Sequence, residues 1–518
     1  MNTANFLSLP GMMLADQEIL VFEGNRLTYG ETLDRVRRLA SSLKALGVGP
    51  GDRVAALQTN SNQYIEAYYA TATVGATFVP LNYRAKPPEV EYMVTAADVK
   101  VLFIGDRYLP LLEQLKPQFP MIQHYVAMES SQPGMHNHED LIAKGSPDIE
   151  DAEVDEDDLS ILMYTSGTTS LPKGVMLTYG GFTNYVVGTV EMADGTPRGT
   201  SLLCAPLYHI AGAMNIMTAI WSGRKIVILR QFDAKEWLAA VQDEQVTHAF
   251  VVPTMMKQLI DHPEFSNYDL SSLENLSYGG APMPFPVIRK AIELFPDSTG
   301  FVNAFGQTET NSTLSVLGPD DHKLNGSQEE VERNLKRLTS VGKPLPDVEV
   351  AILDDDNTPL PADEIGEVVI RTGRAMKGYA GQESATAALF DDEGWLHTRD
   401  MGYLDQDGYI YLVGRKDDII IRGGENIAPA EIEAVLHAHP AVDEAAIIGV
   451  PDEQWGQKIA AFVAVRPGQT VTEDELGDFC RQRLSSFKKP EDIHFMDELP
   501  KNHMGKILKK ELRAEYGE

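Results

Sequence analysis

The chain has 518 residues, of which 43% are hydrophobic and 23% are charged, a composition typical of a globular protein with about three or four units. Its formal net charge of −32, from 76 acidic and 44 basic residues, disfavours nucleic acid or an anionic membrane as the main partner, because both need a basic surface. Its 2 cysteines cannot form a disulfide framework, so we expect a cytoplasmic protein. No basic leader opens the sequence and no apolar run reaches the roughly 18 to 20 residues of a membrane helix, so no integral membrane segment is expected.

Two stretches of the first half predict alternating strands and helices. Between residues 52 and 82, the strand VAAL, the helix YIEAYYATATVG and the strand TFVPLN follow one another. Between residues 201 and 229, SLLCAPL, AGAMNIMTAIWSG and KIVIL repeat the pattern. Continuous apolar strands of this kind suit sheets that are covered on both faces, so we expect two α/β subdomains.

Two motifs in this half resemble functional signatures without completing them. GVGPGD, at 47–52, has Asp52 where a dinucleotide fingerprint needs its last glycine, and it predicts a turn between a helix and a strand. HNHED, at 136–140, has Leu141 where one arm of a dinuclear metal site needs a further histidine. We expect no strand before it, and interpret it as a surface loop.

Three further segments mark the organisation of the chain. The acidic residues of 148–158 predict a solvated connector, and Ser327 followed by Glu330 predicts a capping box that starts a charged surface helix. After Gly414, a charged turn, a short strand, a glycine pair and a helix start a small α+β domain of about 100 residues. Its boundary is expected at the charged residues 415–418.

The run TSGTTSLPKGV, at 165–175, follows the apolar segment 159–164 and has the composition of a phosphate-binding loop. Backbone N–H groups and hydroxyls of such a loop can surround phosphate oxygens, and Lys173 adds positive charge. It differs from a Walker loop because Pro172 precedes the lysine and Gly174 follows it.

Four other motifs contain residue types that a nucleotide could use: YGGAP at 278–282, NAFGQTE at 303–309, WLHTRD at 395–400 and PKNHMGK at 500–506. In NAFGQTE, Phe305 offers an aromatic face, Thr308 a hydroxyl for a phosphate, and Glu309 a hard oxygen ligand for Mg²⁺. Each motif alone is more often structural than functional. Together with the threonine-rich loop they describe an ATP site with its metal.

In order and spacing, these motifs resemble those of the acyl-adenylate-forming ligases, the superfamily of acyl-CoA synthetases, luciferases and nonribosomal adenylation domains. The resemblance implies an α/β fold with a large N-terminal domain, residues 1–416, made of two α/β subdomains and a β-barrel-like third. A small mobile α+β C-terminal domain, residues 417–518, would close the site. It also implies the reaction: a carboxylic acid attacks the α-phosphate of Mg-ATP, and a thiol, usually that of CoA, then displaces AMP from the acyl-adenylate.

The resemblance also assigns roles to single residues. It implies catalytic roles for Lys506, Thr308, Glu309 and His209, with Glu309 as the metal ligand and Lys506 between the substrate carboxylate and the α-phosphate. His209 corresponds to a gate beside the acyl carboxylate, with a packed histidine as the alternative. The residues implied to bind ATP or CoA are Thr165, Ser166, Gly167, Thr168, Thr169, Lys173, Gly279, Gly280, Ala281, Pro282, Asn303, Phe305, Gly306, Asp400, Arg415 and Gly424, with Asp417 as the hinge and His209, Tyr278 and Ala304 in the acyl pocket.

The sequence departs from the family's usual pattern at three positions. Ser170 stands where the phosphate loop usually has glycine, Phe305 where tyrosine is commoner, and Arg399 where glycine usually precedes the ribose-binding aspartate. None of these changes removes a charged group that the chemistry needs.

The acyl acceptor, the acid and the oligomeric state stay open at the level of sequence. The form GGENIAPAEIE favours CoA as the acceptor, a carrier-protein thiol is the alternative within enzymes, and a non-catalytic binding protein is the alternative outside them. The apolar and aromatic surface of 209–217 suits a medium or long acyl chain or an aryl acid. A homodimer is an open expectation.

Overall fold

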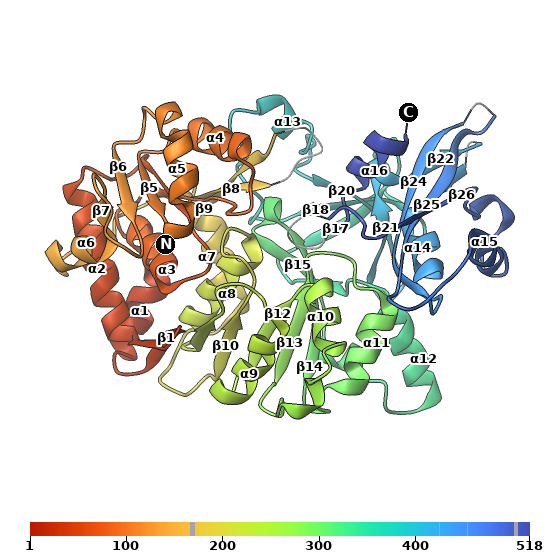
Figure 1. Ribbon diagram of the computed structural model, residues 1–518, viewed down its shortest axis with the longest axis horizontal. Coiled ribbons are helices and arrows are strands. Elements are labelled where there is room, and N and C mark those ends of the chain that lie inside the picture. Colours follow the sequence, from red (N-terminus) through yellow and green to blue (C-terminus); the bar gives the residue numbers. More distant parts are fainter. Residues whose placement is uncertain (166–170, 424, 453, 502–505, 518) are drawn as a thin grey trace.

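The computed structural model describes residues 1–165, 171–423, 425–452, 454–501 and 506–517, and this part of the chain forms five sheets. Figure 1 shows two large sheets with their helices, a smaller sheet beside them, and the C-terminal residues gathered at one end of the molecule. The α/β fold class, with a large N-terminal and a small C-terminal part, is confirmed.

The first large sheet contains eight strands in the order β19-β9-β8-β4-β3-β5-β6-β7. Its central strands run parallel, and β9 and β19 are antiparallel additions at one edge. The predicted strand, helix and strand between residues 52 and 82 are confirmed as β3, α3 and β4. The strands are β3 (Arg53–Leu57), β4 (Thr77–Pro80), β5 (Val101–Ile104), β6 (His124–Ala127), β7 (His136–Asn137), β8 (Leu159–Thr165), β9 (Lys173–Thr178) and β19 (Gly378–Tyr379), and the helices with them are α2 (Tyr29–Ala45), α3 (Asn62–Thr73), α4 (Pro87–Ala96), α5 (Leu109–Leu115), α6 (His138–Lys144) and α7 (Tyr179–Thr189).

The second large sheet contains nine strands in the order β16-β15-β14-β13-β12-β10-β11-β1-β2. The second predicted strand, helix and strand are confirmed as β10, α8 and β11. The strands are β1 (Glu18–Phe22), β2 (Asn25–Thr28), β10 (Thr200–Leu203), β11 (Lys225–Ile228), β12 (His248–Val251), β13 (Asn275–Gly279), β14 (Gly300–Gln307), β15 (Ser312–Leu317) and β16 (Lys343–Pro344), and the helices are α1 (Asn5–Met13), α8 (Ile210–Trp221), α9 (Ala234–Glu244), α10 (Pro253–Ile260), α11 (Phe285–Leu294) and α12 (Gln328–Arg337).

One hydrophobic core joins the two large sheets. Phe78 of β4, Tyr64 of α3, Met217 of α8 and Ile226 of β11 belong to the same buried cluster, so the helices between the sheets are covered on both sides. This packing explains why the strands of the two large sheets are apolar along their whole length rather than at alternate positions. The two sheets therefore form a common rigid base for the loops at their edges.

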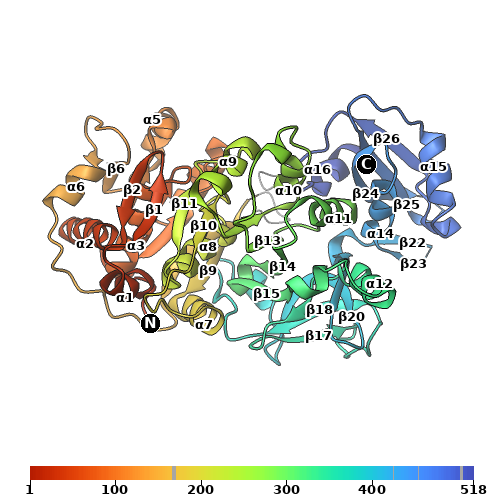
Figure 2. The ribbon, with the colours of Figure 1, turned by 90° about the horizontal axis from the view of Figure 1, so that it is seen from below.

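The third unit of the N-terminal part is a four-stranded antiparallel sheet in the order β17-β18-β20-β21. Its strands are β17 (Glu349–Leu353), β18 (Gly366–Arg371), β20 (Leu396–Leu404) and β21 (Ile410–Arg415), and the short helix α13 (Glu383–Ala387) lies between β19 and β20. In Figure 2 this sheet lies beside α12 at the bottom of the view, below β14 and β15.

The C-terminal unit has hydrophobic clusters of its own, with Ile447, Ile459 and Leu476 buried in one of them. It meets the N-terminal part through α14, which contacts β21, and through an ion pair of 2.9 Å between Lys257 Nζ and Asp443 Oδ1. The boundary between 416 and 417 stays a prediction. The elements are β22 (Ile420–Arg422), β23 (Glu425–Ile427), α14 (Pro429–His437), β24 (Val442–Asp452), β25 (Gly456–Val465), α15 (Glu473–Arg481), β26 (Asp492–Met496) and α16 (Lys509–Tyr516).

The interpretation of HNHED as a surface loop was wrong. His136 and Asn137 form the edge strand β7, and α6 begins at His138, whose buried ring places Nε2 at 2.7 Å from Glu66 Oε2. Arg35 lies between Glu66 and Glu139 and donates hydrogen bonds to both carboxylates. The pattern that resembled a metal arm is thus part of a buried network that joins α2, α3 and α6.

Three other local predictions are confirmed. Gly47 ends α2 with a φ of 80°, Ser327 and Glu330 form the capping box of α12, and the connector at 148–158 contains no helix or strand. A positive φ of this kind is open to glycine without steric cost. No described helix has the length and apolar character needed to cross a membrane.

Candidate active site

The motifs YGGAP and NAFGQTE lie side by side because β13 and β14 are parallel neighbours. Tyr278 pairs with Asn303, and Gly279 pairs with Ala304. A Cβ atom at Gly279 would lie 2.2 Å from the carbonyl oxygen of Ala304, so the close approach requires glycine there. The next residue, Gly280, has a φ of 79° and turns the chain away from the sheet edge. The two expected nucleotide motifs therefore share one edge of the nine-stranded sheet.

Asp400, on β20, is held by two neighbouring side chains. Arg415 Nε lies 3.0 Å from Oδ1, and Gln307 Nε2 donates to Oδ2 over 2.8 Å. The carbonyl oxygen of Thr398 also accepts from Arg415 Nη1 over 2.8 Å and from Gln307 Nε2 over 3.1 Å. The Asp400 side chain is buried, and this burial raises the pKa of its carboxyl above the usual range, against the effect of Arg415. The carboxylate is thus fixed in one orientation at the junction of two sheets.

Lys506 brings the C-terminal unit to the same place. Its side chain has an exposed face, but the surrounding protein removes enough water to lower its pKa below the usual range. Repulsion from Arg415 lowers that pKa further, while Asp400 and Asp418 act in the opposite direction. The lysine therefore lies within electrostatic range of Asp400 and Arg415, and its role in catalysis stays a prediction.

Glu309 and Lys173 come from different sheets and meet at the ring of Tyr379. The Tyr379 hydroxyl donates a 2.9 Å hydrogen bond to Glu309 Oε1, and Lys173 Nζ lies 4.7 Å from the centre of the ring. Thr308 begins the 3₁₀ turn Thr308–Thr310 that presents Glu309. Glu309 Oε2 has no hydrogen-bond or ion-pair partner among the described residues, and an oxygen donor of this kind fits Mg²⁺.

The residues predicted for the acyl pocket lie in different surroundings. His209 is the half-buried N-cap of α8, and the centre of its ring lies 4.4 Å from that of Tyr208. Ala304 is half-buried on β14, whereas Tyr278 is 1% exposed and its hydroxyl lies 2.9 Å from His322 Nε2. Burial raises the pKa of Tyr278 well above its usual range. A role for these residues in the pocket stays a prediction.

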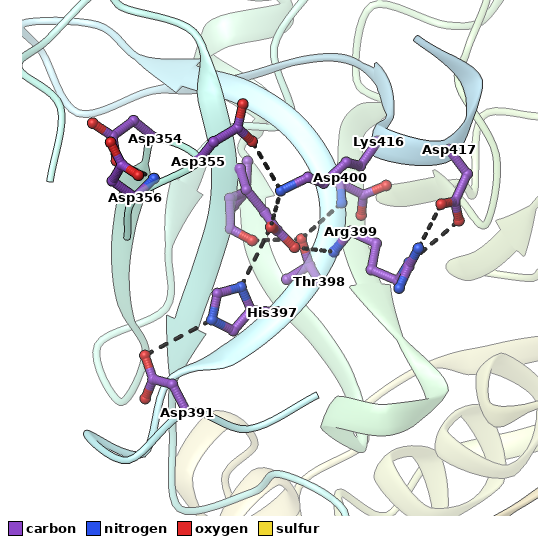
Figure 3. A network of polar contacts seen from close by, with 12 residues as sticks. Asp354, Asp355, Asp356, Asp391, His397, Thr398, Arg399, Asp400, Lys416 and Asp417 are labelled. Carbon is purple, nitrogen blue, oxygen red and sulfur yellow. Dashed lines mark hydrogen bonds and ion pairs between the residues drawn. The ribbon is translucent and has the colours of Figure 1, made fainter. Parts of the chain in front are cut away.

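Arg399 keeps the backbone shape of the glycine that usually occupies its position. Its φ is 61°, in the left-handed region, where a side chain costs about 1 kcal/mol or more. The guanidinium turns away from Asp400 and forms an ion pair with Asp417, with Nε 3.2 Å from Oδ2 (Figure 3). Beside it, Lys416 Nζ lies 3.1 Å from Glu367 Oε2 and 3.3 Å from Asp355 Oδ1. The predicted hinge at Asp417 is therefore flanked by ion pairs to the four-stranded sheet.

Some predicted site residues lie outside the described part of the chain, and others lie near the site. Ser166, Gly167, Thr168, Thr169, the departing residue Ser170 and Gly424 lie outside the described residues. Thr165 ends β8 opposite Lys173, and Asn303 donates a 3.4 Å hydrogen bond to the carbonyl of Ser340. The remaining predicted nucleotide residues Ala281, Pro282, Phe305 and Gly306 lie in or beside the two paired motifs.

Two residues of this site were missed by sequence reasoning. Gln307 lies inside NAFGQTE, so its place beside Asp400 could have been suspected from that motif. Tyr379 has no such signal, because it is separated from Glu309 by 70 residues and belongs to a strand of two residues.

Comparison with known proteins defines the family. The family model of AMP-binding enzymes matches residues 13–380, and the model of the AMP-binding enzyme C-terminal domain matches residues 431–506. The chain is 36% identical over 495 residues to a feruloyl-CoA synthase of an Amycolatopsis species, with 95% of each chain covered. It is 34% identical over 500 residues to the fatty acid–[acyl-carrier-protein] ligase ScoC of Streptomyces coeruleorubidus, with 95% of this chain and 92% of that relative covered.

The fold comparison agrees with these relatives. The solved structure of o-succinylbenzoate CoA synthetase from Bacillus subtilis, in complex with an acyl-adenylate intermediate, matches with a TM-score of 0.84 at 30% identity over 99% of each chain. The chain belongs to the family of AMP-binding enzymes. The resemblance to adenylate-forming ligases and the predicted activity class, acyl activation followed by transfer to CoA, are confirmed.

Proposed function

We propose that the chain is a carboxylic acid:CoA ligase in which the contacts around Asp400 hold the nucleotide and Lys506 performs the adenylation step. The observation that carries this proposal is the position of Lys506 within the electrostatic field of Asp400 and Arg415, although it comes from the C-terminal unit. A cation placed there can stabilise negative charge where an acid carboxylate meets the α-phosphate of ATP. Two anions approach each other in that step, so a fixed cation contributes most in the transition state.

The other described residues support this step. Asp400 can accept hydrogen bonds from both ribose hydroxyls, and Arg415 and Gln307 keep its carboxylate oriented for that purpose. Lys173 lies at the start of β9, next to the threonine-rich loop, and would hold the departing pyrophosphate. Mg²⁺ bound at Glu309 would neutralise charge on the phosphate oxygens. A thiol that then attacks the acyl-adenylate takes the acyl group and releases AMP.

For the acid, we propose an aryl acid or a medium-to-long acyl chain. The half-buried His209 at the start of the apolar helix α8 supports this range, as do relatives named for feruloyl-CoA and o-succinylbenzoate-CoA synthesis. The relative named as an acyl-carrier-protein ligase keeps a carrier thiol as the second candidate acceptor. We also propose a cytoplasmic location, because 2 cysteines suit a reducing compartment, and a homodimer, the commonest oligomer.

Isotope exchange tests the proposal. We expect acid-dependent and Mg²⁺-dependent exchange of pyrophosphate into ATP with at least one member of a panel of aliphatic, branched and aromatic acids. Exchange with none of these acids would refute an acid-activating enzyme. For an active acid, thioester formation with free CoA but not with a pantetheinylated carrier protein supports the CoA ligase, and the reverse result supports the carrier enzyme.

A further inference from the structure

Tyr379 lies where the two large sheets meet at the site. Its two-residue strand β19 pairs with β9, and Ala380 N donates to the carbonyl oxygen of Gly174 over 2.8 Å, so its backbone belongs to the eight-stranded sheet. From the other side, Met376 N donates to the carbonyl oxygen of Glu309 over 2.7 Å. The segment 376–380 therefore ties the turn that presents Glu309 to the strand that begins with Lys173.

The side chain of Tyr379 makes a second link between the same two residues. Its hydroxyl donates to Glu309 Oε1 over 2.9 Å, and its ring faces Lys173 Nζ at 4.7 Å. Lys173 forms no ion pair with any described residue, and the ring of Tyr379 contacts its ammonium. The carboxylate and the ammonium are oppositely charged, and both contact the same tyrosine side chain.

Burial makes this arrangement rigid. Tyr379 is 7% exposed, and its backbone N–H donates to Thr386 Oγ1 over 2.9 Å. A carboxylate oxygen can only accept a hydrogen bond, so the hydroxyl is the donor in this contact.

We infer that Tyr379 is a positioning residue that orients Glu309 toward the metal of the bound nucleotide and keeps Lys173 directed at the terminal phosphates. With Oε1 engaged by the hydroxyl, Oε2 is the oxygen that remains for the metal. This inference rests on the proposed role of Glu309 as the metal ligand. A hydrogen bond that fixes a metal ligand typically changes metal affinity by about 10- to 100-fold when it is removed.

ATP binding followed by calorimetry tests the inference without turnover. The measured quantity is the ratio of the Kd for ATP in EDTA to the Kd for ATP in excess Mg²⁺. Tyr379→Phe keeps the ring and removes the hydroxyl, so we expect the ratio to fall about tenfold while binding in EDTA stays the same. Tyr379→Leu also removes the ring, and we expect ATP binding in EDTA to weaken about threefold as Lys173 loses its support.

Tyr409 offers a matched control. Its hydroxyl donates to Asp321 Oδ1 over 2.9 Å and its ring faces Lys343 Nζ at 4.7 Å, the same pair of contacts at the end of β21 opposite to Arg415. Tyr409→Phe is expected to leave the ratio unchanged. If Tyr379 has only a structural role, Tyr379→Phe will lower the melting temperature but leave the ratio of the two Kd values for ATP unchanged, and the inference is refuted.

Glu309→Gln separates the inference from the proposal on which it rests. If Glu309→Gln lowers the ratio and Tyr379→Phe does not, the inference is overturned while the metal role of Glu309 stands. If Glu309→Gln has no effect, the metal role itself fails and the inference fails with it. If Tyr379→Phe and Tyr379→Leu bind ATP in EDTA with the same Kd, the ring does not hold Lys173 in place and that part of the inference is refuted. Should Tyr379→Phe not fold, Tyr379→Leu, which also lacks the hydroxyl and leaves Glu309 intact, must lower the ratio as well.

Discussion

Lys506→Ala gives the sharpest test of how the two parts of the chain share the reaction. The substitution removes a cation from a position that is partly desolvated and where Asp400 and Arg415 set the local field. A preorganised donor in such a place contributes about 10²- to 10³-fold to the rate, or about 2.7–4 kcal/mol of transition-state stabilisation. We therefore expect adenylation to fall by that factor, with a much smaller change in the KM for ATP.

The two half-reactions are measured separately. Pyrophosphate exchange reports adenylation, and conversion of a chemically supplied acyl-adenylate to the CoA thioester reports the second step. We expect Lys506→Ala to lose the first and keep the second, because the thiol attack needs no cation between two anions. Lys458→Ala is the control, since this lysine lies in the same unit and pairs with Asp492 at 2.7 Å, away from Asp400. An equal loss in both half-reactions refutes the division of labour.

Other substitutions and conditions give further expected outcomes. The adenylation kcat/KM should decline on the alkaline side below the ordinary lysine pKa of 10.5, because Lys506 acts as a cation and its pKa is lowered, and the thioester step should lack this decline. Asp400→Asn should raise the Kd for ATP about tenfold in calorimetry, since it removes the charge that Arg415 and the ribose hydroxyls share. Arg399→Gly should have a free energy of unfolding about 1 kcal/mol larger than that of Arg399→Ala in denaturant titrations. Both variants lose the ion pair with Asp417, but only glycine relieves the φ of 61°. Desolvation of the buried Glu66 is outweighed by His138 and Arg35, which lower the pKa of its carboxyl to about 2. The contribution of Glu66 to the free energy of unfolding is therefore complete above about pH 4.5 and is lost as the pH falls toward 2. In denaturant titrations, His138→Ala should make the free energy of unfolding fall less steeply over this range.

The sequence predicted best what depends on neighbouring residues. The strand, helix and strand of β3, α3 and β4 follow from apolar periodicity, and the capping box of α12 follows from Ser327 and Glu330. The turn at Gly47 follows from the need for a residue that accepts a positive φ. Each of these signals lies within a few residues, so no knowledge of the tertiary structure is needed to interpret it.

Local sequence patterns did not predict contacts between residues that are far apart in the chain. His138 looked like part of a loop because its partner Glu66 is 72 residues away, and burial against a partner is invisible in a local pattern. Arg399 looked like a departure from glycine, and the sequence held no sign that its backbone would keep a positive φ or that its side chain would reach Asp417. The roles of Gln307 and Tyr379 depend in the same way on which strands become neighbours.

The site draws each of its charged groups from a different unit of the fold. Lys173 comes from the eight-stranded sheet, Glu309 from the end of a strand of the nine-stranded sheet, Asp400 from the four-stranded sheet, and Lys506 from the C-terminal unit. Three of these units share a hydrophobic boundary or a paired strand, so their groups are fixed relative to one another. The C-terminal unit has hydrophobic clusters of its own and meets the rest through α14 against β21 and the ion pair of Lys257 with Asp443. A rearrangement would therefore move Lys506 at the lowest cost and leave the nucleotide ligands in place, which is what a two-step reaction requires when only its first step uses the lysine.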